Sequence, residues 1–151
     1  MMNAAHALPG SSAREGATIL VVEDDAAAVV IFAQILTAGG YDVRVAADAR
    51  RGLIEVQRHT PSAVLVDLHM PLMDGLEFLR RVRDAIPDAR MPVALVTGDY
   101  FLDDEIAREI RALGARVHFK PLWDDDLLKL VQDLLNTNQA GDVHGHSTDR
   151  R

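Results

Sequence analysis

Short apolar runs that end at a reactive polar residue recur along this chain, and they constrain its fold more than any other feature. The polar residues are Asp24 after 18–23, Asp67 after 63–66, Thr97 after 93–96 and Lys120 after 116–119. Runs of this length, rich in β-branched residues, are typical of buried strands. Helical patterns separate them, which predicts parallel strands. Because the carboxyl ends of parallel strands meet at one edge of a sheet, we expect all four residues to share one crevice.

The pattern predicts one domain between two tails. A length of 151 residues fits a single domain. We expect flexible tails at 1–16 and 137–151, which lack apolar periodicity. The region 17–136 holds five strand–helix units, which predicts an α/β fold with a doubly wound parallel sheet. Its second strand, 41–46, alternates apolar and polar residues and suits an edge, so we expect the flavodoxin-like strand order 2-1-3-4-5.

Composition excludes several classes of protein. The chain has no cysteine, which excludes disulfides and thiolate metal sites. No apolar stretch reaches the length of a membrane span, and 1–16 lack the pattern of a secretory signal, so a cytoplasmic protein is expected. The formal net charge of −7 argues against binding to a nucleic-acid backbone. The basic cluster Arg80, Arg81 and Arg83 is interleaved with Glu77 and Asp84, as on a solvated helix face.

Two apolar features predict burial outside the crevice. The helix expected over 26–38 is apolar almost all round, which is typical of a largely buried helix. Trp123, at the start of the last helix, is expected to be a packing anchor beside the fifth strand.

The acidic residues of the crevice predict a divalent cation. Glu23, Asp24 and Asp67 would place three carboxylates close together, and a hard cation relieves their repulsion. Mg²⁺ takes oxygen ligands and pairs with phosphate oxygens. Acids after a strand also cap helices, and we assign that role to Asp25.

The same residues suit phosphoryl transfer. Asp67 is the candidate nucleophile, since a carboxylate can attack phosphorus to give an aspartyl phosphate. Such a step needs charge neutralisation and alignment more than acid–base chemistry. The Lys120 ammonium and the Thr97 hydroxyl could each contact a phosphoryl oxygen.

The stretches 19–25, 66–75, 96–98 and 119–121 closely resemble the receiver domain of bacterial response regulators, over about 17–136. The resemblance implies a (βα)5 fold in which Asp67 accepts a phosphoryl group from a histidine kinase or a histidine phosphotransfer protein. It implies that Glu23, Asp24, Asp67 and the backbone carbonyl of His69 bind Mg²⁺. It also implies a cis Lys120–Pro121 bond, and switch roles for Thr97 and Lys120.

The sequence departs from the family pattern beside the lysine. The family usually has Tyr or Phe three residues before it, where this chain has Val117. The residue after Thr97 is Gly98 instead of the common alanine, which leaves more room for a phosphoryl group. In the family, the positions of His69 and Asp99 tune the lifetime of the phosphate.

The leading hypothesis is a phosphoacceptor signalling module, not an enzyme beyond its own phosphorylation and dephosphorylation. It signals to an unknown downstream protein through protein contacts, without direct DNA binding, and a homodimer stays open as an alternative. Two other functions stay open as alternatives. One is a receiver-fold interaction protein that works unphosphorylated, which Val117 favours modestly. The other is a phosphatase that forms an aspartyl phosphate, against which His69 counts because such enzymes have an acid there.

Overall fold

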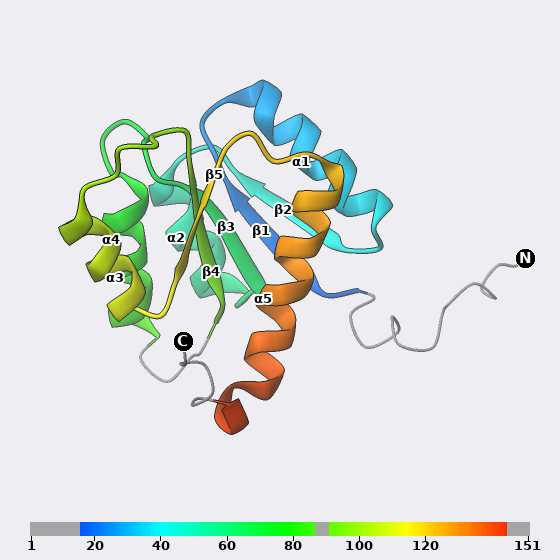
Figure 1. Ribbon diagram of the computed structural model, residues 1–151. Helices are drawn as coiled ribbons and strands as arrows, with labels where there is room; N and C mark the ends of the chain where they lie inside the picture. The colour runs from blue at the N-terminus through cyan, green and yellow to red at the C-terminus, as the bar shows by residue number, and fades with distance from the viewer. Residues whose placement is uncertain (1–15, 87–90, 145–151) are drawn as a thin grey trace, which may run out of the picture.

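The protein forms a parallel β-sheet between two layers of helices (Figure 1). The computed structural model describes residues 16–86 and 91–144. Its five strands lie in the order β2-β1-β3-β4-β5, which confirms the predicted α/β fold and places β2 at an edge. The strands are β1 Thr18–Val22, β2 Asp42–Ala46, β3 Ala63–Asp67, β4 Val93–Thr97 and β5 Arg116–Phe119.

A helix follows each strand, and aspartates begin four of them. The helices are α1 Ala26–Ala38, α2 Ala49–Arg58, α3 Gly75–Ala85, α4 Asp104–Ala112 and α5 Asp124–His144. The side chains of Asp25, Asp48, Asp74 and Asp103 accept backbone N–H bonds at the starts of α1 to α4, which satisfies donors that a helix leaves free. None of the helices in the described ranges has the length and apolar character that a membrane crossing requires.

Most of the two predicted tails, 1–16 and 137–151, falls outside the described residues. Helix α5 continues to His144, past the predicted domain limit at residue 136. Residues 1–15 and 145–151 lie outside the described residues. The domain limits therefore stay a prediction.

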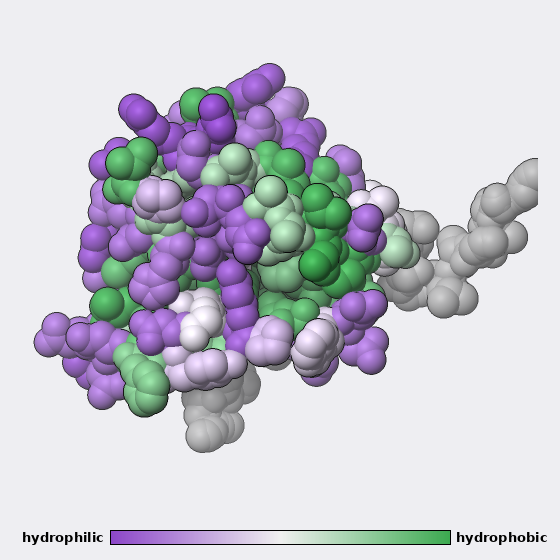
Figure 2. All heavy atoms as spheres, turned by 90° about the horizontal axis from the view of Figure 1, so that it is seen from above, coloured by the Kyte–Doolittle hydropathy of each residue, from purple (hydrophilic) through white to green (hydrophobic). Residues whose placement is uncertain are grey.

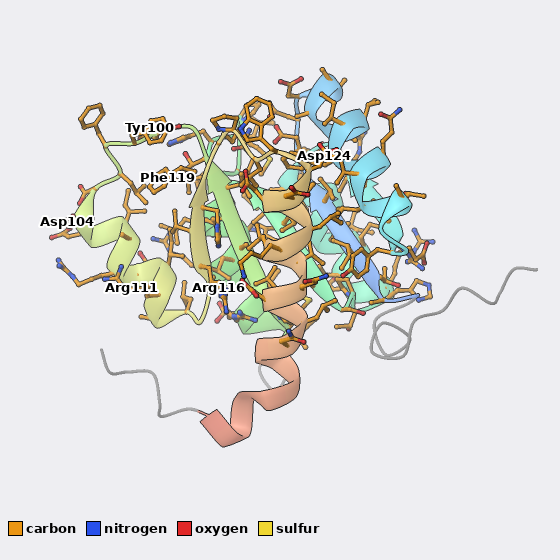
Figure 3. The ribbon with its side chains drawn as sticks, turned by 45° about the vertical axis from the view of Figure 1, so that its right-hand side comes forward. Tyr100, Asp104, Arg111, Arg116, Phe119 and Asp124 are labelled. Carbon is orange, nitrogen blue, oxygen red and sulfur yellow. The ribbon has the colours of Figure 1, made fainter. Side chains whose placement is uncertain are left out.

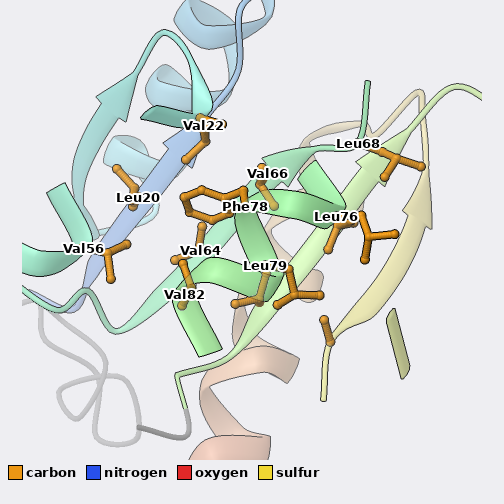
Figure 4. Close-up of a cluster of buried hydrophobic side chains, with 14 of the residues drawn as sticks. Leu20, Val22, Val56, Val64, Val66, Leu68, Leu76, Phe78, Leu79 and Val82 are labelled. Atoms are coloured by element: carbon orange, nitrogen blue, oxygen red, sulfur yellow. The ribbon is translucent and has the colours of Figure 1, made fainter. Parts of the chain in front are cut away.

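The two faces of the sheet carry separate apolar cores because strand side chains alternate. Leu20 and Val22 of β1 point to the core beneath α2, α3 and α4, where Phe78 is fully buried (Figure 4). Ile19 and Val21 point to the other core, which α1 and α5 cover. Since β1, β3 and β4 are packed on both faces, their sequences read as continuous apolar runs.

The prediction that α1 is largely buried was wrong. Only Phe32 and Leu36 of this helix are buried. Val30 and Ile31 are 54% and 52% exposed, and apolar side chains over α1 form a patch on the right of Figure 2. Trp123, expected to be a packing anchor, is 68% exposed. One helix face suffices to cover this side of the sheet beside α5, so the remaining apolar side chains of α1 face outward.

Candidate functional site

The carboxyl edge of the sheet gathers the acidic residues that the sequence singled out. Glu23 and Asp24 directly follow β1, and Asp67 is the last residue of β3. The parallel register sets Val22 beside Val66, so both strands end at the same level. As a result, carboxylate oxygens of Glu23, Asp24 and Asp67 all lie within 4.8 Å of one another.

Lys120, just beyond β5, supplies a positive charge to this group. Its Nζ lies 3.2 Å from Glu23 Oε1 and 3.6 Å from Asp67 Oδ1. Burial alone would lower the pKa of Lys120, but the two carboxylates outweigh it and raise that pKa above its ordinary value. The lysine therefore stays charged and offsets part of the repulsion between the acids.

Glu23 is the most buried of the acids, with 3% of its surface exposed. Burial raises the pKa of its carboxyl above the ordinary value, and the nearby Asp67 raises it further. Its Oε2 accepts a hydrogen bond of 3.1 Å from the Asp25 N–H, which favours the charged form. A cation beside Glu23 would stabilise its charged form, which burial and the neighbouring Asp67 disfavour.

Thr97 is fully buried at the end of β4 and contacts the neighbouring backbone. Its hydroxyl oxygen accepts a hydrogen bond of 3.0 Å from the Asp99 N–H, so it caps the turn that follows the strand. Its carbonyl oxygen accepts a bond of 2.8 Å from the Lys120 N–H. The threonine and the lysine are therefore joined through the backbone, and the Lys120–Pro121 bond is cis, as the resemblance implied.

Helix α3 approaches the backbone of Asp67 closely at Gly75. The Gly75 N–H donates a 2.8 Å hydrogen bond to the carbonyl of Leu68. A Cβ placed on Gly75 would lie 2.5 Å from the Asp67 carbonyl oxygen, closer than real Cβ atoms come. Only glycine permits this approach, so Gly75 lets α3 support the end of β3. In the sequence, Gly75 only closes the stretch 66–75, and nothing there indicates that a glycine is required at this position.

His69 lies at the rim of the crevice, across from the loop after β4. Its side chain is 62% exposed, and its Nε2 is 3.4 Å from Asp99 Oδ2. The pair bridges the loop after β3 and the loop after β4 at the predicted site.

The sequence reasoning missed two aromatic residues beside Lys120. The rings of Tyr100 and Phe119 stack with their centroids 5.3 Å apart, and the Tyr100 hydroxyl donates a hydrogen bond to the Lys120 carbonyl. The sequence feature that could have indicated this contact is the tyrosine three residues after Thr97. Val117, by contrast, packs partly buried against the core beneath α4.

The donor set fits Mg²⁺. All three side chains offer hard carboxylate oxygens within reach of one ion, and Asp24 is exposed, so water can complete the coordination. Lys120 contacts both Glu23 and Asp67, so an anionic group bound at this edge would meet a positive charge there as well.

Comparison with known families identifies the class of this protein. The family model of the response regulator receiver domain matches residues 19–132. The chain therefore belongs to the receiver domain family of two-component signalling. The fold and the acidic cluster at the carboxyl edge agree with this assignment.

Individual relatives cover the same region. The response regulator MprA of Mycolicibacterium vanbaalenii is 32% identical over 132 residues, which are 85% of this chain and 54% of MprA. The chain thus spans about half the length of that relative. Sporulation initiation phosphotransferase F of Bacillus subtilis is 31% identical over 118 residues, 78% of this chain and 92% of that protein. The structure of the chemotaxis protein CheY4 of Vibrio cholerae superimposes with a TM-score of 0.73 at 30% identity, over 80% of this chain and 99% of CheY4.

Proposed function

We propose that Asp67 is the phosphoacceptor of a two-component phosphorelay. A carboxylate oxygen of Asp67 attacks the phosphorus of a phosphohistidine on a histidine kinase or a histidine phosphotransfer protein. The new bond joins this oxygen to phosphorus, the phosphorus–nitrogen bond breaks, and the imidazole leaves with the electron pair. The observation that carries the proposal is the position of Asp67, which has a carboxylate oxygen within 4.8 Å of those of Glu23 and Asp24 and another contact of 3.6 Å to the Lys120 ammonium.

Each neighbouring residue has a role in this transfer. Glu23, Asp24, Asp67 and the backbone carbonyl of His69 would hold Mg²⁺, which neutralises charge on the phosphoryl oxygens when it is bound. The Lys120 ammonium moves from Asp67 towards a phosphoryl oxygen. The Thr97 hydroxyl turns from the Asp99 N–H and donates to another oxygen. The switch consists of these two exchanges of partner.

The output of the switch is a contact with another protein in the cytoplasm. Two relatives, the response regulator MprA and sporulation initiation phosphotransferase F, support a place in a relay. The basic side chains on α3 support the absence of direct DNA binding, because Arg80 and Arg81 pair with Glu77 and Glu109. Sedimentation of the unphosphorylated and the phosphorylated protein tests whether two copies pair on phosphorylation.

Intact-protein mass spectrometry tests the phosphoacceptor. Wild type incubated with acetyl phosphate and Mg²⁺ should gain the mass of one phosphoryl group, and Asp67→Asn should gain none. Asp84→Asn, at an exposed acid on α3, is the matched control and should label like wild type. Chelation of Mg²⁺ should abolish labelling, because three carboxylates then repel the incoming group.

The opposite results separate the alternatives. Labelling of Asp67→Asn at the wild-type level would refute the assignment of the phosphoacceptor. A wild type that takes up no phosphoryl group would favour the interaction protein that works unphosphorylated. Continuous release of phosphate from varied phosphomonoesters would favour the phosphatase.

A further inference from the structure

An aromatic pair outside the crevice ties the loop after β4 to the end of β5. Tyr100 lies in that loop and Phe119 is the last residue of β5; their rings are inclined by 23° with centroids 5.3 Å apart. Figure 3 shows both side chains together between α4 and β5. The Tyr100 hydroxyl also donates a hydrogen bond to the Lys120 carbonyl. One tyrosine therefore contacts both the residue before the lysine and the lysine backbone.

These contacts hold Lys120 from two sides. Its N–H donates to the Thr97 carbonyl at 2.8 Å, and its carbonyl accepts from Tyr100. Its side chain reaches inward to Glu23 and Asp67. A change in the position of the ammonium therefore acts on a backbone that is fixed to the end of β4 and to the loop that follows it.

The loop leads directly into α4. Leu102 packs against the core, and Asp103 caps the helix by accepting from the Glu105 N–H. A groove of about 540 Å³ lies beside the aromatic pair, and Tyr100, Leu102 and Val117 help to line it. The small side chain of Val117 leaves this space next to the ring, so Tyr100 has somewhere to move.

We propose that Tyr100 is a positioning residue that couples Lys120 to the loop and to α4. This inference rests on the proposed phosphorylation of Asp67. When the lysine follows the phosphoryl group, the stack with Phe119 carries the displacement of β5 into the loop. Val117, partly buried against the core, has no ring that could make this connection. Tyr100 is 61% exposed, so its contacts can break and reform without opening the core.

Amide NMR with Mg²⁺ and beryllofluoride, which mimics the phosphoryl group, tests the coupling. Wild type should show shifts near the site, at Leu68 and Gly98, and remote shifts in α4, at Ala107 and Arg111. Tyr100→Ala should keep the local shifts and bind beryllofluoride within about threefold of wild type, while its α4 shifts fall by at least about half. Tyr100→Phe, which keeps the stack and loses the hydroxyl, should fall between the two.

Two further variants separate coupling from a general effect on the loop. Phe101→Ala is the matched control, because this neighbouring aromatic residue is 93% exposed; it should keep the full α4 shifts. Phe119→Ala should lose the α4 shifts to the same extent as Tyr100→Ala. The double variant should lose no more of these shifts than either single variant, as expected for one shared contact.

The outcomes distinguish this inference from the proposed function. Full α4 shifts in Tyr100→Ala, or an equal loss in Phe101→Ala, would overturn the role of Tyr100 and leave the phosphoacceptor intact. A wild type that shows no shift with beryllofluoride would refute the phosphoacceptor itself, and the role of Tyr100 with it.

Discussion

Replacing Gly75 by alanine tests whether α3 holds the phosphoacceptor strand in place. The added Cβ would lie 2.5 Å from the Asp67 carbonyl oxygen and 2.9 Å from Leu68 Cα. Both atoms belong to the backbone, so no side-chain rotation relieves the contact. Either α3 moves away from β3, or the end of β3 shifts together with Asp67.

The expected loss of stability follows from this overlap. Overpacking of a tight contact costs about 1–3 kcal/mol. Alanine is the better helix former by about 0.5–1 kcal/mol, which offsets only part of the cost. With a urea dependence of about 2 kcal/mol per molar, a net cost of about 1–2 kcal/mol should lower the unfolding midpoint by roughly 0.5–1 M. Phosphorylation by acetyl phosphate should also slow, since Asp67 leaves its position beside Lys120.

Gly98→Ala is the matched control for this experiment. A Cβ at Gly98 meets no atom within 4 Å, and the residue follows the same edge of the sheet. This variant should be unchanged or more stable by about 0.4–1 kcal/mol, because alanine restricts the unfolded chain. Equal urea midpoints for Gly75→Ala and wild type, together with an unchanged labelling rate, would refute the argument that α3 supports Asp67.

Three other variants test separate parts of the fold by urea unfolding. Arg83→Met should lower the free energy of unfolding by about 1–3 kcal/mol, because the Arg83 guanidinium donates to the carbonyls of Leu113 and Met91. An unchanged urea midpoint would count against the role of these hydrogen bonds. Asp48→Ala should lose about 0.5–2 kcal/mol by removing the cap of α2, and no loss would contradict that role. Burial lowers the pKa of His118 below its ordinary 6.5, so the unfolded chain binds more protons in acid. Wild type should therefore lose more stability than His118→Gln between about pH 7.5 and about pH 5, and parallel pH profiles would refute this.

The sequence predicted the sheet and the meeting of the acids well, for a definite physical reason. The apolar runs of β1, β3 and β4 are buried on both faces, so their composition alone marks them as strands, and the polar residue at or just after each end marks the edge. Asp67 and Lys120 are 53 positions apart by number, yet parallel strands that end at one level bring them within 3.6 Å. Strand order and register thus convert local sequence signals into a three-dimensional site.

Other features depend on contacts that no local pattern encodes. The apolar surface of α1 predicted burial, but composition does not say how much neighbouring surface is available to cover Ile31. Gly75 and Tyr100 owe their importance to single distances, to the Asp67 backbone and to Phe119. Such distances follow from how α3 and the loop after β4 are placed by the whole fold.

The position of Lys120 at the edge strand links the site to the assembly of the protein. Glu23 and Lys120 are separated by 97 positions in the chain, and β5 is the outermost strand beside β4. Until that strand has joined the sheet, the acidic cluster lacks its internal counter-charge, and mutual repulsion opposes a compact edge. Docking of β5 removes that penalty at the moment when it completes the site. The ion pairs of Lys120 therefore form only when β5 lies in the sheet, so the charge balance of the site depends on the last strand of the chain as well as on the first.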